Sequence, residues 1–520
     1  PGVAHPVRGR ALELNLPSGE ACPIGEELVL GNGIRVFLKD TDLFDDEIIV
    51  RARRWGGLSE HQQAGGVLGG RGLVSCEAQT CSMSAMMLGI CGLSVESLQE
   101  CLDGRRVEPN PPSLEAYSTG LDCSASPSDL EVLLMLLHLL FLCPVEPGEK
   151  STGRLSLVKF GLLAWRLGEN RDPASLFRRR VQKILTGDHP YTRLPSLWSI
   201  LRLNFKRASA IFNERVSMPQ DWTFVLVGRL PSKELLLPML DAYLGSIPNP
   251  DGAAAAAGHS VPRELAAREA VTPLDIRFPE KSLREEVRLQ MIDPKGSTLL
   301  CFPVSLKAVT TPGSIESAEA ELRELFRLRL LVRLLETRLV EVLRFKRGQV
   351  YGVSVADDFS LSPPHLGRPR RGTVSIGFEC DPAESDELVG VTRGELQQLR
   401  DGTSAFTEAN VSAALEQERR EFEEVFHKND WWANTVLDLY FSRCQAVTGE
   451  VGASVALWWR VRWEVVSTLD AAGAHEVLQA TLPKDATSAV ILMRPKGGKP
   501  KAAGAEAGVA GGEAEDARDE

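Results

Sequence analysis

The sequence lacks several patterns that would place it in a common protein class. Its longest apolar run, Val132–Cys143, is about half of the ~20 residues that a membrane-spanning helix needs. No two of its eight histidines lie three to five residues apart, and neither C-x-x-C nor G-x-S-x-G occurs. These absences argue against a membrane span, a zinc site built on a helical histidine pair, and a serine-hydrolase elbow.

Size and charge indicate a globular chain of more than one domain. At 520 residues the chain exceeds one ordinary hydrophobic core, and 43% of its residues are hydrophobic and 25% charged. A net charge of −11 argues against nucleic acid as a partner. From Glu506 onward there are six acids and one Arg, a balance of −5, within a low-complexity tail at 496–520 that we expect to be disordered.

The ten cysteines lie mostly in apolar runs. Their positions favour buried free thiols, which suit a reducing compartment, although the sequence leaves disulfides open. The chain starts at Pro1 without a signal-peptide pattern, which fits a fragment of a longer protein. The compartment is not fixed by the sequence, and we favour a soluble organellar one.

The chain is organised around a long helix that starts near Ser314 and is followed by a strand, VYGVSV at 350–355. Apolar residues such as Leu325, Leu335 and Leu339 recur at spacings of three and four, which predicts a wide buried face. The other face carries mixed charges that we expect to be solvated. These are Glu321, Arg323, Glu324, Arg327, Arg329, Arg333, Glu336 and Arg338.

The run LLETRLVEVLRFKRGQVYGVSV at 334–355 resembles the C-terminal signature of the pitrilysin/insulysin-type metallopeptidases, the inverted-zincin family. In that family an Arg on the last turn of a long helix and a Tyr in the next strand hold the bound peptide near zinc. The matching positions are Arg344 and Tyr351. A guanidinium and a phenol suit a substrate carbonyl or an oxyanion. The structural alternative is an Arg that complements a helix C-terminus and a Tyr half-buried in a strand.

The order of the predicted elements indicates an α+β fold of two tandem homologous domains, each with helices on one face of a mainly antiparallel sheet. Self-similarity between 126–140 and 381–399 supports an internal repeat, and the resemblance implies the same architecture. Within the first half, we predict one helix over 194–213. The predicted parts are an arm (1–25), a first metallopeptidase-like domain (26–248), a linker (249–270), a second such domain (271–495) and the tail (496–520).

The zinc motif of an inverted zincin, H-x-x-E-H, is absent. At its place after the second predicted strand stands a glycine-rich loop, GGVLGGRG, which lacks the Lys and the Ser or Thr of a phosphate loop. We therefore predict no metal ligand in this chain. Among the single histidines, we expect His61 at the surface, His138 satisfied in the core and His189 in a structural turn. The Trp-rich segments at 431–432 and 458–463 predict core or interface aromatics.

Two functional hypotheses follow from the resemblance. In the first, the chain is the non-catalytic C-terminal half of a zinc metalloendopeptidase that cleaves peptides or small unfolded proteins. Its partners are then a zinc-bearing N-terminal half, or a separate catalytic subunit, and a peptide substrate that contacts Arg344 and Tyr351. In the second, the chain is a catalytically dead scaffold subunit of the same family. Under both hypotheses this segment alone is inactive, and zinc belongs to the parent assembly.

Overall fold

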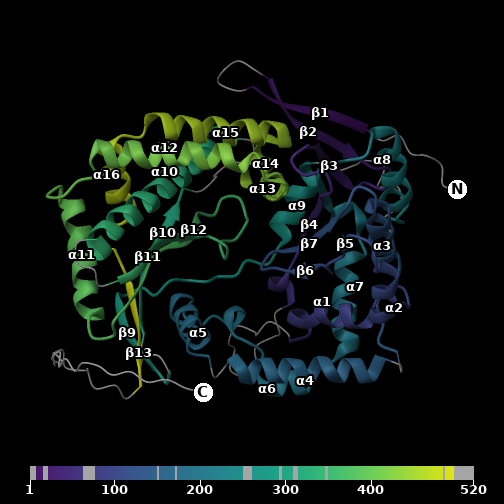
Figure 1. Cartoon of the computed structure of the whole chain (residues 1–520), viewed down its shortest axis with the longest axis horizontal. Coiled ribbons are helices and arrows are strands. Elements are labelled where there is room, and N and C mark those ends of the chain that lie inside the picture. The colour runs from purple at the N-terminus through teal and green to yellow at the C-terminus, as the bar shows by residue number, and fades with distance from the viewer. Residues whose placement is uncertain are drawn as a thin grey trace, which may run out of the picture.

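A computed structural model of the chain has two lobes, each built on one β-sheet (Figure 1). It describes residues 8–15, 21–61, 76–148, 151–169, 172–249, 261–291, 295–307, 314–345, 350–483 and 486–496. The glycine-rich loop at 65–72 and nearly all of the predicted tail lie outside these ranges. Helices and sheets combine as predicted, and the α+β fold class is confirmed.

The first sheet has eight strands in the order β1-β2-β3-β8-β4-β7-β5, with β6 beside β7. β3 and β8 are parallel and the other pairs are antiparallel. The strands are β1 (Arg8–Asn15), β2 (Ala21–Val29), β3 (Arg35–Asp40), β4 (Ile48–Trp55), β5 (Val107–Glu108), β6 (Ser113–Leu114), β7 (Ser118–Ala125) and β8 (Thr223–Gly228). Residues of β1 and early β2 thus form strands where we expected an arm.

The second sheet has five strands in the order β11-β12-β10-β13-β9, and only β13 and β9 are parallel among the described pairs. The strands are β9 (Leu283–Leu289), β10 (Gly296–Leu306), β11 (Val350–Asp358), β12 (Arg370–Cys380) and β13 (Ala489–Pro495). β8 lies between β3 and β4 in the first sheet, and β13 lies between β9 and β10 in the second; each is parallel to the earlier strand and antiparallel to the later one. This shared topology agrees with the predicted repeat.

Helices of the first half are α1 (Cys76–Leu88), α2 (Val95–Leu102), α3 (Leu130–Leu142), α4 (Thr152–Glu169), α5 (Pro173–Leu185), α6 (Leu197–Leu201), α7 (Phe205–Val216), α8 (Lys233–Leu240) and α9 (Val261–Ala270). Of these, α3 packs on the first sheet, whereas α5 contacts β9 and β13 of the second sheet. The apolar α3, which contributes Leu133 and Leu137, packs with Val36 and Val50 of the sheet in one buried cluster. This cluster is the core of the first lobe.

Helices of the second half are α10 (Ile315–Leu339), α11 (Ser385–Asp401), α12 (Glu408–Val425), α13 (Asn429–Tyr440), α14 (Arg443–Thr448), α15 (Val451–Thr468) and α16 (Ala471–Thr481). The predicted buried face of α10 is confirmed, because Leu325, Leu335 and Leu339 are buried with Ile376 of β12. Glu321 departs from the prediction of a solvated face. It is 5% exposed and pairs with Arg443 at 3.3 Å.

The second face of the first sheet is covered by α13, which comes from the other half of the chain (Figure 1). Because side chains alternate along a strand, Phe37, Val225 and Val227 point away from the first core. They are buried against α13 residues that include Val436 and Leu437. The two lobes therefore share a hydrophobic cluster, and the Trp-rich segments border it as predicted interface aromatics.

Two local predictions in the first half were wrong. The expected helix over 194–213 is two helices, because Asn204 caps a new one by accepting a hydrogen bond from the backbone N–H of Arg207 at 3.2 Å. The expected linker contains α9, which packs near α14 through Arg268. The alanines and charged residues of α9 favour a helix, whereas the composition of the segment 249–270 as a whole is typical of a linker.

The cysteines follow the prediction only in part. Six free thiols among the described residues are buried, Cys101 is exposed, and Cys91 is bonded to Cys143. Burial of the thiols was predictable from the apolar runs, whereas the pairing was not, because residues 52 apart in sequence give no local signal of proximity. Within the described ranges, no helix is long and apolar enough to cross a membrane.

Candidate peptide-binding cleft

The long helix α10 places Arg344 at the surface. The Ser314 hydroxyl caps the start of the helix by accepting a hydrogen bond from the backbone N–H of Ser317 at 3.3 Å. At its far end the helix widens into a π-helical turn, Val340–Phe345, in which Leu343 is buried and Arg344 is exposed. Such turns re-aim the side chains that follow a regular helix, and they are frequent at functional sites.

Tyr351 occupies a β-bulge at the start of β11. Val350 pairs with Cys380 and Gly352 pairs with Glu379, so Tyr351 is the extra residue in this ladder. The π-helical turn that carries Arg344 contacts β11, which brings the two backbone positions to the same end of the helix–strand pair. The Tyr351 side chain lies outside what the structure describes, so its convergence with Arg344 stays a prediction.

β11 is an edge strand. Within the described part of the chain it pairs only with β12, which leaves its other side without a partner strand. The backbone N–H and C=O groups on such an edge can pair with an extended peptide. The bulge suits a peptide site, because it ends the regular pairing of β11 with β12 beside the predicted contact residues Arg344 and Tyr351.

A large cavity of about 840 Å³ lies between the lobes near the other end of β11. Its walls come from α10, α13, α14, the β11–β12 connection and the β6–β7 turn. The β11–β12 connection is anchored to the first lobe, because the Tyr117 hydroxyl donates to the Leu361 carbonyl at 3.0 Å. Burial raises the pKa of Tyr117 strongly, so this hydroxyl keeps its proton at neutral pH.

The cavity wall carries closely spaced arginines. Burial lowers the pKa of Arg370, and repulsion from Arg443 and Arg329 adds to this effect, although Glu321 opposes it. Arg443 is held by hydrogen bonds to the carbonyls of Arg368 and Pro363, each at 2.8 Å. Arg329, which the periodicity assigned to a solvated face, lines the cavity with its side chain 52% exposed. The spacing of charged residues along α10 did not indicate that Arg329 lines a cavity between the lobes.

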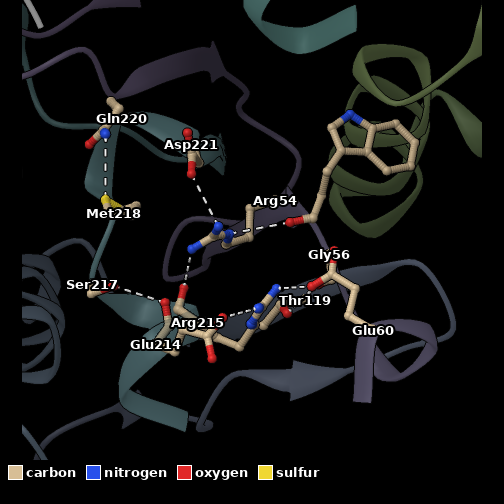
Figure 2. Close-up of polar contacts among 11 residues, drawn as sticks. Arg54, Gly56, Glu60, Thr119, Glu214, Arg215, Ser217, Met218, Gln220 and Asp221 are labelled. Carbon is tan, nitrogen blue, oxygen red and sulfur yellow. Dashed lines mark hydrogen bonds and ion pairs between the residues drawn. The ribbon is translucent and has the colours of Figure 1, made fainter. Parts of the chain in front are cut away.

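A second polar cluster lies beside the end of β4 (Figure 2). Arg54 donates to Asp221 at 3.1 Å and to the Arg215 carbonyl at 2.7 Å, while Arg215 donates to Glu60 at 2.6 Å and to Glu214 at 2.5 Å. These groups border a smaller cavity of about 240 Å³. Each guanidinium faces at least one carboxylate, so the cluster is an internally paired network that ties α7 to β4.

The three singled-out histidines have structural positions. His61 is only partly exposed, its Nε2 is buried without a hydrogen-bond partner in the described chain, and burial and Arg215 lower its pKa. The expectation of a surface histidine was therefore wrong. His138 Nδ1 lies 2.6 Å from the Tyr243 carbonyl, and His189 Nδ1 accepts from the backbone N–H of Tyr191 at 3.2 Å. The structural turn at His189 is confirmed, and His138 makes its expected hydrogen bond but is only partly buried.

The first α-helix after β4 is α1, and the glycine-rich loop at the predicted place of the zinc motif precedes it, outside the described residues. The buried side chains of α1 include Cys76, Glu77, Thr80 and Cys81. Burial raises the pKa of both thiols to about 11, which disfavours the thiolate that a metal requires. Across the described ranges, no group of three His, Cys, Asp or Glu residues is placed to hold a metal ion. The described residues therefore do not fit zinc.

Comparison with known proteins supports the resemblance. Residues 214–418 match the model of the peptidase M16 inactive domain. A "zinc protease PQQL-like" protein of Arabidopsis thaliana is 29% identical over 474 residues, which are 90% of this chain and 43% of that protein. The chain is related to the M16 peptidases. It spans less than half the length of this relative, which is described as a zinc protease.

Solved structures of M16 peptidases share the fold. The periplasmic protease PqqL from Escherichia coli matches with a TM-score of 0.67 at 15% identity, over 95% of this chain and 48% of that one. A peptidase M16 inactive domain from Pseudomonas fluorescens matches with a TM-score of 0.61 at 14% identity, over 91% of this chain and 99% of that one. At 14–15% identity, these likenesses show that the chain shares the fold of these proteins.

Proposed function

We propose that this chain is the non-catalytic C-terminal half of a zinc metalloendopeptidase. A zinc-bearing half, on the same polypeptide or on a separate subunit, supplies the hydrolytic centre. This half supplies a wall of the substrate chamber. The relation to M16 zinc proteases and the poor fit of the described residues to zinc support this division of roles.

The observation that carries the proposal is the junction of α10 and β11. It combines an exposed Arg344 on a π-helical turn, a bulge at Tyr351 and an open strand edge. An extended peptide that pairs with β11 gains backbone hydrogen bonds along the edge. At its end, the Arg344 guanidinium donates to the scissile carbonyl and stabilises the oxyanion as it forms, and the Tyr351 phenol donates beside it.

Kinetics of the assembled protease test these roles. Arg344→Ala should lower kcat/KM by about 100-fold, the usual cost of losing an oxyanion donor, and Tyr351→Phe should also lower it. Arg327→Ala is the matched control, because Arg327 is exposed on the same helix and lies away from the junction. Its kcat/KM should stay within twofold of the wild type.

Two results would contradict the proposal. Unchanged cleavage by Arg344→Ala would remove Arg344 from the substrate site. An assembly that contains this chain, binds no zinc and cleaves no peptide would favour the scaffold hypothesis. Circular dichroism of each variant checks that the fold is kept, so that a loss of activity reports on the site.

A further inference from the structure

The cavity between the lobes has more positive than negative charge in its wall. Five arginines and three carboxylates line it. Arg53 and Asp438 pair at 2.8 Å, and Glu115 accepts a hydrogen bond from Ser118 at 2.7 Å. Of the other four lining arginines, Arg370 and Arg443 lie within ion-pair distance of the lining Glu321. Arg462 pairs with Glu418, and Arg329 lies near Asp357. A half-enclosed wall with an excess of positive charge raises the local concentration of anions.

Two of these arginines keep their hydrogen-bond donors open. Arg329 lies 3.9 Å from Asp357, and Arg370 lies 3.9 Å from Glu321, which gives attraction without a hydrogen bond. Neither guanidinium donates a hydrogen bond to any residue that the structure describes. Their side chains are 52% and 34% exposed, so solvent reaches them through the cavity. By contrast, Arg443 and Arg462 donate to protein acceptors.

The position of Arg329 and Arg370 along a peptide paired with β11 follows from two lengths. From Arg329 to Arg344 the helix advances about 22 Å, at about 1.5 Å per residue. From Tyr351 to Asp357 the strand advances about 20 Å, at about 3.3 Å per residue. The two lengths are nearly equal, and Arg329 lies near Asp357, so α10 and β11 run side by side over this length.

We infer that Arg329 and Arg370 bind a carboxylate of the substrate about six residues from the scissile bond. The inference rests on the proposed function, since it takes the peptide to pair with β11 and its scissile carbonyl to lie at Arg344. A planar guanidinium offers parallel N–H donors that match a carboxylate. The ligand is thus an acidic side chain or the C-terminal carboxylate of a short peptide, at a distance set by the strand.

The experiment uses the assembled protease and a series of fluorogenic peptides. Each peptide is amidated and carries one Glu, or one Gln in its place, at a single position between two and ten residues from the cleaved bond. On one side of that bond, Glu near position six should raise kcat/KM about fivefold to tenfold over Gln. A free-acid peptide that ends at the same position should show the same gain if a terminal carboxylate also fits.

The variants tie this preference to the cavity. In the double variant Arg329→Gln and Arg370→Gln the gain should vanish, so that the Glu and Gln peptides are cleaved with equal kcat/KM. The matched control Arg327→Gln removes one charge from the same helix outside the cavity and should keep the gain. Arg329→Glu should reverse the preference and favour Lys over Gln at that position.

Several results would overturn the inference. These are equal cleavage of the Glu and Gln peptides by the wild type, or a preference that survives the double variant. Competitive inhibition by micromolar inorganic phosphate that the double variant abolishes would assign the site to a phosphate ligand instead. Failure of the proposed function is distinguishable, because it appears as normal cleavage by Arg344→Ala whatever the outcome of the Glu series.

Discussion

Leu437 on α13 offers a test of whether the two lobes fold as one unit. It is 3% exposed and belongs to the hydrophobic cluster in which α13 packs against Phe37, Val225 and Val227 of the first sheet. Replacing a buried Leu by Ala costs about 2–5 kcal/mol through lost burial and a cavity. A central value of about 3 kcal/mol lowers the ratio of folded to unfolded molecules by about 150-fold.

The control is Leu478→Ala, a substitution of the same chemistry in a fully buried residue that belongs to the second core alone. Hydrogen exchange monitored by mass spectrometry separates the two effects. Leu437→Ala should speed exchange in α13 and also in β4 and β8 of the first sheet. Leu478→Ala should speed it in the second lobe and leave β4 and β8 close to the wild type.

The result that refutes this reasoning is a Leu437→Ala chain in which only α13 exchanges faster. The first sheet would then be stable without α13, and the shared cluster would be a contact between independent domains. A loss of stability below about 1 kcal/mol in urea unfolding would also refute the reasoning, because removing a well-packed buried Leu side chain costs more than that.

Three further predictions concern burial, pH and redox state. Tyr440→Phe should cost about 1–3 kcal/mol in urea unfolding, because the buried phenol donates to Glu27 at 2.6 Å, whereas Tyr243→Phe on an exposed pair should cost under about 0.5 kcal/mol. Replacing Cys91 and Cys143 by Ser should cost up to about 4 kcal/mol, from the closure of a 52-residue loop; equal stability of the oxidised and reduced wild type would contradict this. Burial raises the pKa of the free thiols in the core, to about 11 for Cys76 and Cys81 and to about 12 for Cys123, Cys301 and Cys444. Their stabilisation is therefore complete below about pH 9 and is lost as the pH rises towards 12. The loss reaches at most about 1.4 kcal/mol per thiol per pH unit, and urea midpoints that stay constant between pH 8.5 and 10.5 would refute it.

Local periodicity predicted the elements that decide the fold. The spacing of apolar residues defined α10 as a buried helix, and the alternation after it gave β11. The internal repeat was visible because both lobes place similar helices after similar strands. These signals are local, since each depends on residues a few positions apart that share one face.

Features that depend on tertiary contacts were not predictable. The pattern of α13 shows an apolar face but does not identify its partner, which is a sheet of the other half. Glu321 and Arg329 have the spacing of a solvated face, yet one pairs with a buried Arg443 and the other lines a cavity. The positions Arg344 and Tyr351 came from a family resemblance, and the structure adds a π-helical turn and a bulge in the backbone there.

The central claim is that this chain completes a protease whose zinc lies elsewhere. The most direct test expresses the zinc-bearing half and this 520-residue chain as separate polypeptides and measures peptide cleavage and bound zinc for each alone and for the mixture. We predict stoichiometric zinc in the other half only, and cleavage by the mixture at least 100-fold faster than by that half alone. Equal cleavage with and without this chain, or zinc-dependent cleavage by this chain alone, would contradict the account.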